Sequence, residues 1–524
     1  MEMRPTLEGY AGIPQETRLL FRGLCLADSL DVEGLLQTSH RYLAEGTKTE
    51  LPLATETGVD NSRLHCYSRV IISLGTKPST KPFDEVIRYL KKQPIAYGLM
   101  WSTLLLKSRK ITLTKFESRN FEDFIWRTLF AKTLPASDFS LVTAKNYRVC
   151  SVPWNIMQTA GLNSLQFVKQ PAYPMLDTQG VDVFIAQTPY PGRVDIKTRL
   201  VVRYHDAFPV LMPHTVANKS RHEATHYYAL MSNVQSGAYF ACVSEATRQD
   251  LLRLFPEVHD RAITIPNMVS HHFFDEDSSA DCIPQIVRSR LNLLSPDTHP
   301  AFNNLEEQAQ FYTHHLNHGS FNYLLVVSTL EPRKNHSRLI AAWELMRIEC
   351  NPPLKLIVIG SLGWDFEPVM RDMRTWIDQG ELFVLCNVPA DDLRVLYKHA
   401  ATTVCPSLAE GFDYSGVESM RCGGVVIASD IPVHREIYAN AAEYFDPYCT
   451  VSLASTIKKV LYEQNTSHVQ EQLRANGKKV SARYLPENIL PQWLSFFKKI
   501  NPRVLDPDIT SSLEEGVQRI AASK

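Results

Sequence analysis

The chain has 524 residues, of which 44% are hydrophobic and 21% are charged, and its 55 lysines and arginines nearly balance 56 aspartates and glutamates. This length and composition exclude a mainly disordered chain and predict two folded domains, because single cores rarely exceed roughly 250–300 residues. The balanced charge argues against a nucleic-acid partner, which would need a basic surface. The sequence shows no signal-peptide core and no run of about 18 apolar residues, so we expect a cytoplasmic protein.

The first compositional feature along the chain is residues 84–132, where ten lysines and arginines and five acids are interleaved with apolar runs such as LMWSTLLL. A basic, aromatic surface helix would suit a peripheral contact with the inner face of the cytoplasmic membrane. The alternative is an amphipathic helix whose apolar side is buried in the protein. Residues 35–175 contain no motif that we can assign.

Further along, short apolar runs rich in β-branched residues alternate with segments of helical spacing, a pattern typical of parallel sheets covered by helices. Ser244 predicts the N-cap of a helix over residues 245–255. The predicted strands are VDVFIAQ, TRLVVRYHD and AYFACVS in the first half and NYLLVVS, LKLIVIGS, LFVLCNV, ATTVCPS and GVVIASD in the second.

This alternation predicts an α/β fold with two Rossmann-like, doubly wound domains. We place the N-terminal domain at residues 1–274, a polar linker with one or two helices at 275–320, and the C-terminal domain at 321–482. Residues 483–502 carry three aromatic residues at helical spacing, which predicts a terminal helix that packs across the domain boundary. The tail from residue 503 has the composition of a solvated segment.

Two acids stand out in the run PSLAEGFDYSGVESM. Glu410 follows a predicted strand, Gly411 and Gly416 allow a tight turn, and Glu418 lies near the start of the next helix. Ligands of open parallel sheets bind at this edge, where free N–H groups face a phosphate and carboxylates accept hydrogen bonds from sugar and ribose hydroxyls. Helix capping is the alternative role, and the spacing alone does not decide between them.

Two adjacent cations, Arg333 and Lys334, lie in the turn after the first strand of the same domain. They suit a diphosphate, because Arg offers a planar fork and Lys a compact charge. The alternative is a solvated basic turn.

The runs TLEPRKN, IGSLGWDFE, PSLAEGF and AEYFDP occur in this order. With them, residues 322–500 resemble the donor domain of glycosyltransferase family 4, and most of all bacterial O-antigen mannosyltransferases. Residues 8–30 resemble the family's glycine loop and first helix. The runs YHDAFPVLMP, CVSEATRQDLL and ITIPNMV extend the resemblance over residues 180–275. It implies the GT-B fold, in which two Rossmann-like domains face each other across a cleft.

The resemblance also implies a role for each matching residue. Arg333 and Lys334 would bind the donor diphosphate, while Glu410 would bind the transferred sugar and Glu418 the ribose. Val388 would lie beside the base and His205 near the reacting sugar, although a histidine at a strand end often has only a structural role. The remaining donor-binding positions are Gly12, near the phosphates, and Gly411, Phe412, Asp413, Tyr414 and Ser415, whose loop amides would contact sugar and phosphate.

Two features depart from the family pattern. Where the family usually reads Gly-Phe-Gly-Leu-Pro, this chain has Asp413 and Tyr414 at the third and fourth positions. A carboxylate there would accept a hydroxyl hydrogen bond or repel an acidic donor, so the donor sugar stays open, with GDP-mannose as our first choice. Few residues precede Gly12, and we therefore expect the first strand to be nearly absent.

Members of the resembled family transfer a sugar with retention of configuration and without a metal. Arg333, Lys334 and the helix dipole before Glu418 would then stabilise the departing diphosphate. The acidic triplets at residues 275–277 and 506–508 follow no strand, and the ten cysteines include no Cys-x-x-Cys pair, so we expect no metal and no cofactor.

The expected partners are a nucleotide sugar and a glycan or lipid-linked acceptor. A nucleotide-sugar 2-epimerase-like enzyme and a non-catalytic nucleotide-sugar binder remain alternatives. A dehydrogenase is disfavoured, because no Gly-x-Gly-x-x-Gly follows a strand.

Overall fold

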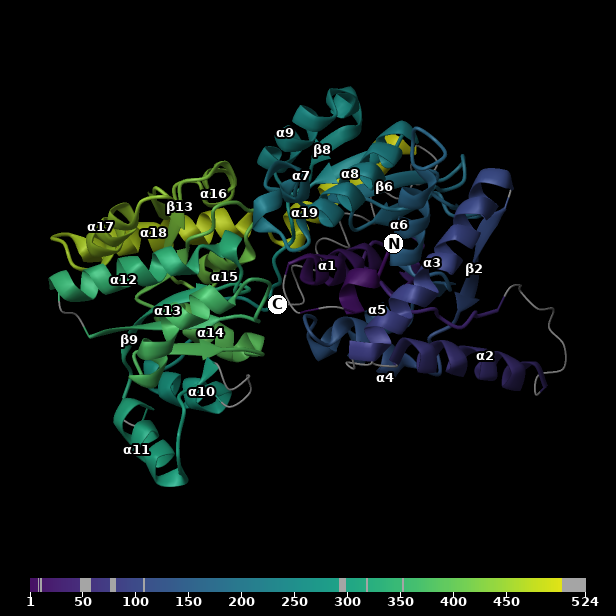
Figure 1. Cartoon of the computed structure of the whole chain (residues 1–524). Coiled ribbons are helices and arrows are strands. Elements are labelled where there is room, and N and C mark those ends of the chain that lie inside the picture. Colours follow the sequence, from purple (N-terminus) through teal and green to yellow (C-terminus); the bar gives the residue numbers. More distant parts are fainter. Residues whose placement is uncertain are drawn as a thin grey trace.

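The computed structural model describes residues 1–7, 9, 12–47, 58–75, 82–106, 109–291, 298–316, 319–350 and 353–501. An N-terminal half, purple to teal, and a C-terminal half, green to yellow, lie beside each other (Figure 1). Each half contains β-sheet covered by helices. The predicted tail from residue 503 lies outside the described residues.

The C-terminal sheet has six parallel strands in the order β11-β10-β9-β12-β13-β14. In chain order this is 3-2-1-4-5-6, the arrangement of a doubly wound Rossmann fold, with its switch point between β9 and β12. The predicted fold class is therefore confirmed for this half, and β14 is a strand that the sequence analysis did not predict. The strands are β9 (Asn322–Val327), β10 (Leu354–Ile359), β11 (Leu382–Leu385), β12 (Thr402–Cys405), β13 (Val426–Ser429) and β14 (Ala442–Phe445).

Both faces of this sheet are buried, which explains why its strands are continuous apolar runs. Along β9, Leu324 and Val326 join one hydrophobic cluster, whereas Tyr323 and Leu325 join another on the opposite face. The covering helices are α12 (His336–Cys350), α13 (Glu367–Asp378), α14 (Ala390–His399), α15 (Tyr414–Arg421), α16 (Pro432–Tyr438), α17 (Thr450–Leu461) and α18 (Thr466–Ala482).

The N-terminal half contains two four-stranded sheets, in the orders β1-β3-β2-β4 and β5-β6-β7-β8. The second is parallel, as predicted, but β2 runs antiparallel to β3, so the first is a mixed sheet. The strands are β1 (Gly34–Leu36), β2 (Lys110–Phe116), β3 (Tyr147–Cys150), β4 (Met175–Asp177), β5 (Val183–Ala186), β6 (Arg199–Tyr204), β7 (Tyr239–Cys242) and β8 (Ala262–Thr264).

Residues 1–3 connect these two sheets. The Glu2 N–H donates to the Ile185 carbonyl at 2.8 Å, and the Met3 N–H donates to the Leu35 carbonyl at 3.0 Å. The segment thus lies between β1 and β5 and takes the place of the first strand. The expectation that this strand is nearly absent is confirmed, because these three residues make only an isolated bridge and no strand is assigned among the described residues before α1.

The N-terminal helices surround these sheets, and two more helices lie in the predicted linker. Helix α9 begins after Ser244, whose hydroxyl accepts from the Thr247 N–H, which confirms the predicted N-cap. None of the helices in the described ranges is long and apolar enough to cross a bilayer. The helices are α1 (Ile13–Cys25), α2 (Gly58–Gly75), α3 (Pro82–Leu105), α4 (Glu122–Ile125), α5 (Phe139–Thr143), α6 (Trp154–Ser164), α7 (Phe208–Leu211), α8 (Lys219–Gln235), α9 (Glu245–Leu254), α10 (Ile283–Arg290) and α11 (Leu305–Leu316).

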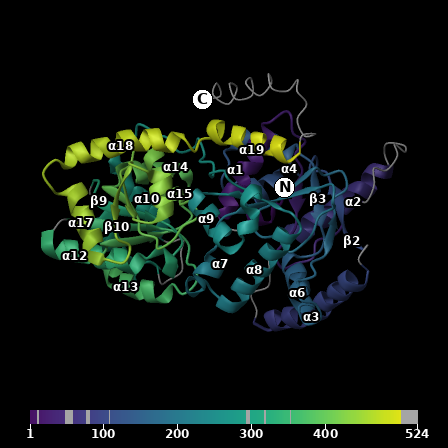
Figure 2. The same cartoon turned by 90° about the horizontal axis from the view of Figure 1, so that it is seen from above.

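Helix α19 (Pro486–Ile500) crosses from the C-terminal half back to the N-terminal half, following α18 along one side of the molecule (Figure 2). Its Trp493 is fully buried beneath the Arg203 guanidinium, and the Phe496 ring lies 6.2 Å from that of Tyr239 on β7. These contacts are those predicted for a terminal helix that packs across the boundary. The exact boundaries at residues 274, 320 and 482 stay a proposal.

The two halves also contact each other directly. The Glu436 carboxylate, on α16, accepts from the Glu245 and Ala246 N–H groups at 2.6 and 2.9 Å. An acid at the start of α9 is favourable because free N–H groups and the helix dipole meet there. The Trp364 indole donates to the Thr215 carbonyl at 2.9 Å. The ligand-binding edges of the two sheets are thereby brought face to face.

Candidate functional site

The candidate site lies at the switch point of the C-terminal sheet, where β9 and β12 are neighbours. The turn after β9 carries Arg333 and Lys334 in a short 3-10 helix (Pro332–Lys334), and the loop after β12 carries Glu410. Asn335 ends the turn at φ 59° and donates to the carbonyls of Pro406 and Pro447, which fixes the turn against the loop after β12. The sheet topology thus brings together residues that are 76 positions apart in sequence.

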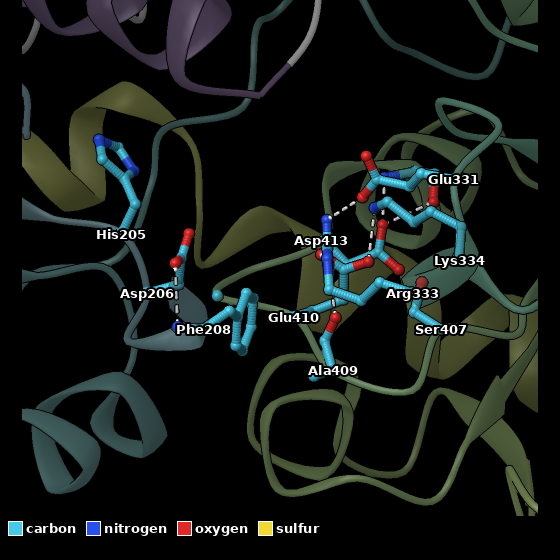
Figure 3. A network of polar contacts seen from close by, with 12 residues as sticks. His205, Asp206, Phe208, Glu331, Arg333, Lys334, Ser407, Ala409, Glu410 and Asp413 are labelled. Carbon is cyan, nitrogen blue, oxygen red and sulfur yellow. Dashed lines mark hydrogen bonds and ion pairs between the residues drawn. The ribbon is translucent and has the colours of Figure 1, made fainter. Parts of the chain in front are cut away.

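Arg333, Lys334 and Glu410 form one ion-paired cluster (Figure 3). The Lys334 ammonium lies 2.5 Å from one Glu410 oxygen, and an Arg333 guanidinium nitrogen lies 3.0 Å from the other. The same guanidinium pairs with Glu331 at 2.7 Å and donates to the Ala409 carbonyl. The predicted cations and acid therefore meet as expected, with each cation held by a carboxylate.

The cluster is strongly polarised. Burial alone would raise the pKa of Glu410, but Arg333 and Lys334 outweigh it and hold the pKa below the ordinary value. At Arg333, burial favours the neutral form, yet Glu410 and Glu331 raise the pKa further. The site is therefore a fixed array of full charges, the kind of preorganised field that stabilises a charged ligand.

Glu418 lies in the second turn of α15 and faces the N-terminal half. Its carboxylate accepts from the Gln15 amide at 2.8 Å and from the Tyr397 hydroxyl at 3.2 Å. Burial raises its pKa to about 7, even though these two hydrogen bonds favour the charged form. Gln15 lies in the first turn of α1, directly after Gly12, which has φ 69° and precedes the helix as its N-cap. The predicted glycine loop and the predicted ribose-binding acid therefore lie close to each other.

The loop after Glu410 is held by its own polar side chains. Asp413 has φ 61°, and one of its carboxylate oxygens accepts from the Ser415 N–H and hydroxyl. The other oxygen lies 3.1 Å from the His434 imidazole on α16. Both oxygens thus contact the loop itself, because Asp413 caps α15 and pairs with a buried histidine. The predicted contact of this carboxylate with a sugar hydroxyl, or its repulsion of an acidic donor, stays a prediction.

The second departure from the family pattern, Tyr414, connects the two halves. Its hydroxyl donates to Glu16 at 3.0 Å, and the same carboxylate pairs with Arg203 at 2.9 Å, with Glu16 and Arg203 fully buried. Phe412 is also buried, and its ring packs against the rings of Tyr414 and Tyr484. The side chains of these two loop residues therefore pack inside the protein, and the contact of their backbone amides with sugar and phosphate stays a prediction.

His205 lies at the carboxyl end of β6, on the opposite side of the site from the ion-paired cluster, with Phe208 between them (Figure 3). Burial and the nearby Arg203 lower the pKa of His205 to about 3, so its ring is neutral. The Arg333 guanidinium lies over the Phe208 ring at 5.1 Å. A side chain on Gly411 would place its Cβ 2.0 Å from the His205 carbonyl oxygen, so glycine is required for this approach of the halves.

The base-binding position and the first acidic triplet also lie within the described residues. Val388 follows β11 and is half-buried against the core. The acidic triplet at 275–277 serves ion pairs, Asp275 with Lys398 and Glu276 with Arg394. Across the described ranges, no three His, Cys, Asp or Glu side chains are grouped so that they could hold a metal ion.

Sequence reasoning missed four residues that shape the site: Gln15, Glu16, Arg203 and His434. One signal was available, because Arg203 interrupts the apolar run TRLVVRYHD, and a charge inside a buried strand requires a partner. The partner, Glu16, could not be named from sequence, since 187 positions separate the two residues.

Comparisons with known proteins agree with this geometry. Residues 311–480 match the family model "Glycosyl transferases group 1". The chain is 26% identical over 270 residues to O-antigen chain mannosyltransferase B of Escherichia coli, an alignment that covers 52% of this chain and 63% of the relative. It is 30% identical over 168 residues to serotype-specific mannosyltransferase WbdA of Escherichia coli, covering 32% of this chain and 20% of the relative.

The chain thus spans less than two thirds of the curated relatives it matches. Among solved structures, a sucrose-phosphate synthase from Thermosynechococcus elongatus is 16% identical with a TM-score of 0.47, covering 68% of this chain and 84% of that one. The family match coincides with the sheet that carries Arg333, Lys334, Glu410 and Glu418. The expected resemblance to family 4 is confirmed, and residues 311–480 of this chain are similar to the glycosyl transferases group 1 family.

Proposed function

We propose that the protein is a retaining glycosyltransferase that moves a hexosyl group from a nucleoside-diphosphate sugar to a hydroxyl of a glycan or lipid-linked glycan. The observation that carries this proposal is the meeting of Arg333, Lys334 and Glu410 at the switch point of a 3-2-1-4-5-6 sheet. Ligands of such sheets bind at this point. Two cations suit a diphosphate there, and the adjacent acid suits sugar hydroxyls.

In this reaction the bond between the anomeric carbon and the phosphate oxygen breaks while the acceptor oxygen bonds to the same face of the sugar. The acceptor proton passes to the departing phosphate oxygen. Negative charge develops on the diphosphate, and Arg333 and Lys334 lie fixed where they would stabilise it. Glu418, beside Gln15, would bind the ribose, and Val388 would lie beside the base.

GDP-mannose is our proposed donor, because relatives that match the chain are named mannosyltransferases, two of them O-antigen chain mannosyltransferases. The test is a thermal-shift series with GDP-, UDP- and dTDP-sugars, since a ligand that binds the folded state raises its stability. Release of free nucleoside diphosphate is then followed with and without an acceptor glycan. We expect acceptor-dependent release. Conversion of the donor into its epimer without an acceptor, or binding without turnover, would contradict a transferase.

We also propose that α3 contacts the membrane on which a lipid-linked acceptor would lie. Its inner side packs on α6, yet its outer side is apolar as well, with Ile95, Trp101 and Leu105 between 42% and 73% exposed. No charged residue occurs from 94 to 106, whereas Lys92 and Arg109 flank the stretch. An uncharged surface between cations is complementary to an anionic lipid surface.

Vesicle cosedimentation tests this contact. We expect binding to vesicles of phosphatidylglycerol and phosphatidylcholine, reduced in the double variant Trp101→Ser, Leu105→Ser. The matched control is Ile196→Ser, which removes another exposed apolar side chain away from α3. Equal binding by the double variant and the control would contradict the assignment.

A further inference from the structure

Two buried side chains at the ligand-binding edge of the N-terminal sheet lack hydrogen-bond partners. Gln187 follows β5 and His205 follows the adjacent parallel strand β6. Gln187 is fully buried, and neither its amide oxygen nor its amide nitrogen has a partner; the Nε2 atom of His205 is also buried without one. Buried polar groups are nearly always hydrogen-bonded, so three unpaired atoms on neighbouring strand ends require an explanation.

The backbone around these atoms is firmly held, which leaves only the side chains unsatisfied. The Gln187 N–H donates to Glu2 at 2.8 Å. The His205 carbonyl lies against Gly411 of the donor-half loop. The unpaired atoms therefore lie at the end of the N-terminal sheet that faces the candidate site.

The chemistry of the three atoms selects a neutral ligand. Burial holds the His205 ring neutral, and its Nε2 atom has no partner. The Gln187 amide presents one acceptor and one donor group. A fully ionised phosphate or carboxylate has no proton to give to the amide oxygen, whereas a hydroxyl both donates and accepts. Neighbouring hydroxyls on one sugar ring match all three atoms.

We propose that Gln187 is a specificity-determining residue that binds hydroxyls of a hexopyranose ring, next to His205, which the family resemblance already places near the reacting sugar. This inference rests on the proposed function and adds to it the group on the N-terminal half that would hold the sugar. The ring would belong either to the donor's hexosyl group or to the acceptor.

The test is Gln187→Leu, compared with Gln37→Leu as a matched control. Gln37 is equally buried, but its amide donates to the Val152 carbonyl and accepts from the Tyr190 hydroxyl. We expect Gln187→Leu to keep or raise Tm because no hydrogen bond is lost, and Gln37→Leu to lower Tm. For Gln187→Leu, kcat/KM of sugar transfer should fall about tenfold or more, while Kd for the free nucleoside diphosphate stays within about twofold.

Two kinetic arms identify the source of the ring. Slower donor hydrolysis without acceptor would assign the subsite to the donor's hexosyl group, and a raised KM for the acceptor alone would assign it to the acceptor. Wild-type transfer rates in Gln187→Leu, or a lower Tm like that of Gln37→Leu, would overturn the proposal.

Failure of the proposed function gives a different result. If wild-type protein transfers sugar from no donor, the function is wrong, and the subsite is then judged by saturation-transfer NMR with methyl α-mannoside and methyl α-glucoside alone. The subsite requires a signal in wild-type protein that Gln187→Leu abolishes, and absence of that signal in wild-type protein overturns it.

Discussion

The two sides of the candidate site differ in their electrostatics. The C-terminal side is an array of full charges in which Arg333 and Lys334 are paired with Glu410. On the N-terminal side, burial holds His205 uncharged and Gln187 has an unpaired, buried amide, and the Asp206 carboxyl is the charged group that interacts with Arg333. A fixed charge array suits an anionic leaving group, and neutral donors and acceptors suit hydroxyls. The comparison suggests that one half binds the diphosphate and the other orients the sugar.

This division requires the halves to touch, and the largest effect is expected from preventing that contact. Gly411→Ala would place a Cβ 2.0 Å from the His205 carbonyl oxygen and hold the two sides apart. A misplacement of about 1 Å can cost roughly 100-fold in rate, so we expect kcat/KM of sugar transfer to fall by about that factor or more. Nucleoside diphosphate affinity should change little, because the charged cluster lies within one half.

The matched control is Gly98→Ala, since a Cβ on this helical glycine meets nothing within 4 Å. Near-wild-type turnover by Gly411→Ala would show that contact between the halves is not needed for the reaction.

The next largest effect is expected from a change in the charged cluster of the C-terminal half. Lys334→Ala removes one cation from the diphosphate position and should weaken nucleoside diphosphate binding by about 1.5–3 kcal/mol, the usual worth of a hydrogen bond to a charged group. Isothermal titration measures this change. Lys355→Ala is the control, because Lys355 is as buried as Lys334 and pairs with Glu381 elsewhere on the same half. An equal loss in both variants would point to a general electrostatic effect and remove the diphosphate assignment.

A smaller effect concerns Glu418, which lies between the two sides. Its pKa is raised from 4.5 to about 7, so the folded protein holds this proton more tightly than the unfolded chain does. The stabilisation is fully present below about pH 4.5 and is lost as the pH rises through 7. In wild-type protein the free energy of unfolding should therefore decrease between pH 5 and pH 8. Glu418→Gln has a neutral side chain at every pH, so we expect its decrease over the same range to be smaller by about 1–2 kcal/mol.

Denaturant unfolding at several pH values measures this difference. Parallel pH profiles for wild type and Glu418→Gln would mean that Glu418 does not titrate in this range.

Much of the C-terminal half could be predicted from sequence, because its strands are buried on both faces and therefore appear as uninterrupted apolar runs. The positions of Arg333, Lys334 and Glu410 followed from those strands, since cations and acids just past a parallel strand meet at one edge. The mixed sheet was missed for the opposite reason. In β2 (Lys110–Phe116) exposed residues are mixed with buried ones, so it is no continuous apolar run, and it pairs with β3 across more than 30 positions.

The loop at 411–415 shows a second limit. The sequence places Asp413 where the family has glycine, but nothing in it reveals that His434, 21 positions later, supplies the partner. Similarly, the orphaned amide of Gln187 looks from sequence like the polar end of a strand. Contacts between distant segments decide both cases, and local patterns do not encode them.

The smallest expected effect tests whether the charged side is sufficient without a metal. Sugar transfer should be unchanged in excess EDTA, because Arg333 and Lys334 occupy the position where a metal ion would otherwise neutralise the diphosphate. The acids nearest to them are already paired with these cations, so a divalent ion would have to displace a built-in charge to reach Glu410. Initial rates with EDTA, and with added magnesium or manganese, make the measurement. If EDTA abolishes activity and added magnesium or manganese restores it, then the two cations alone do not neutralise the negative charge of the leaving group.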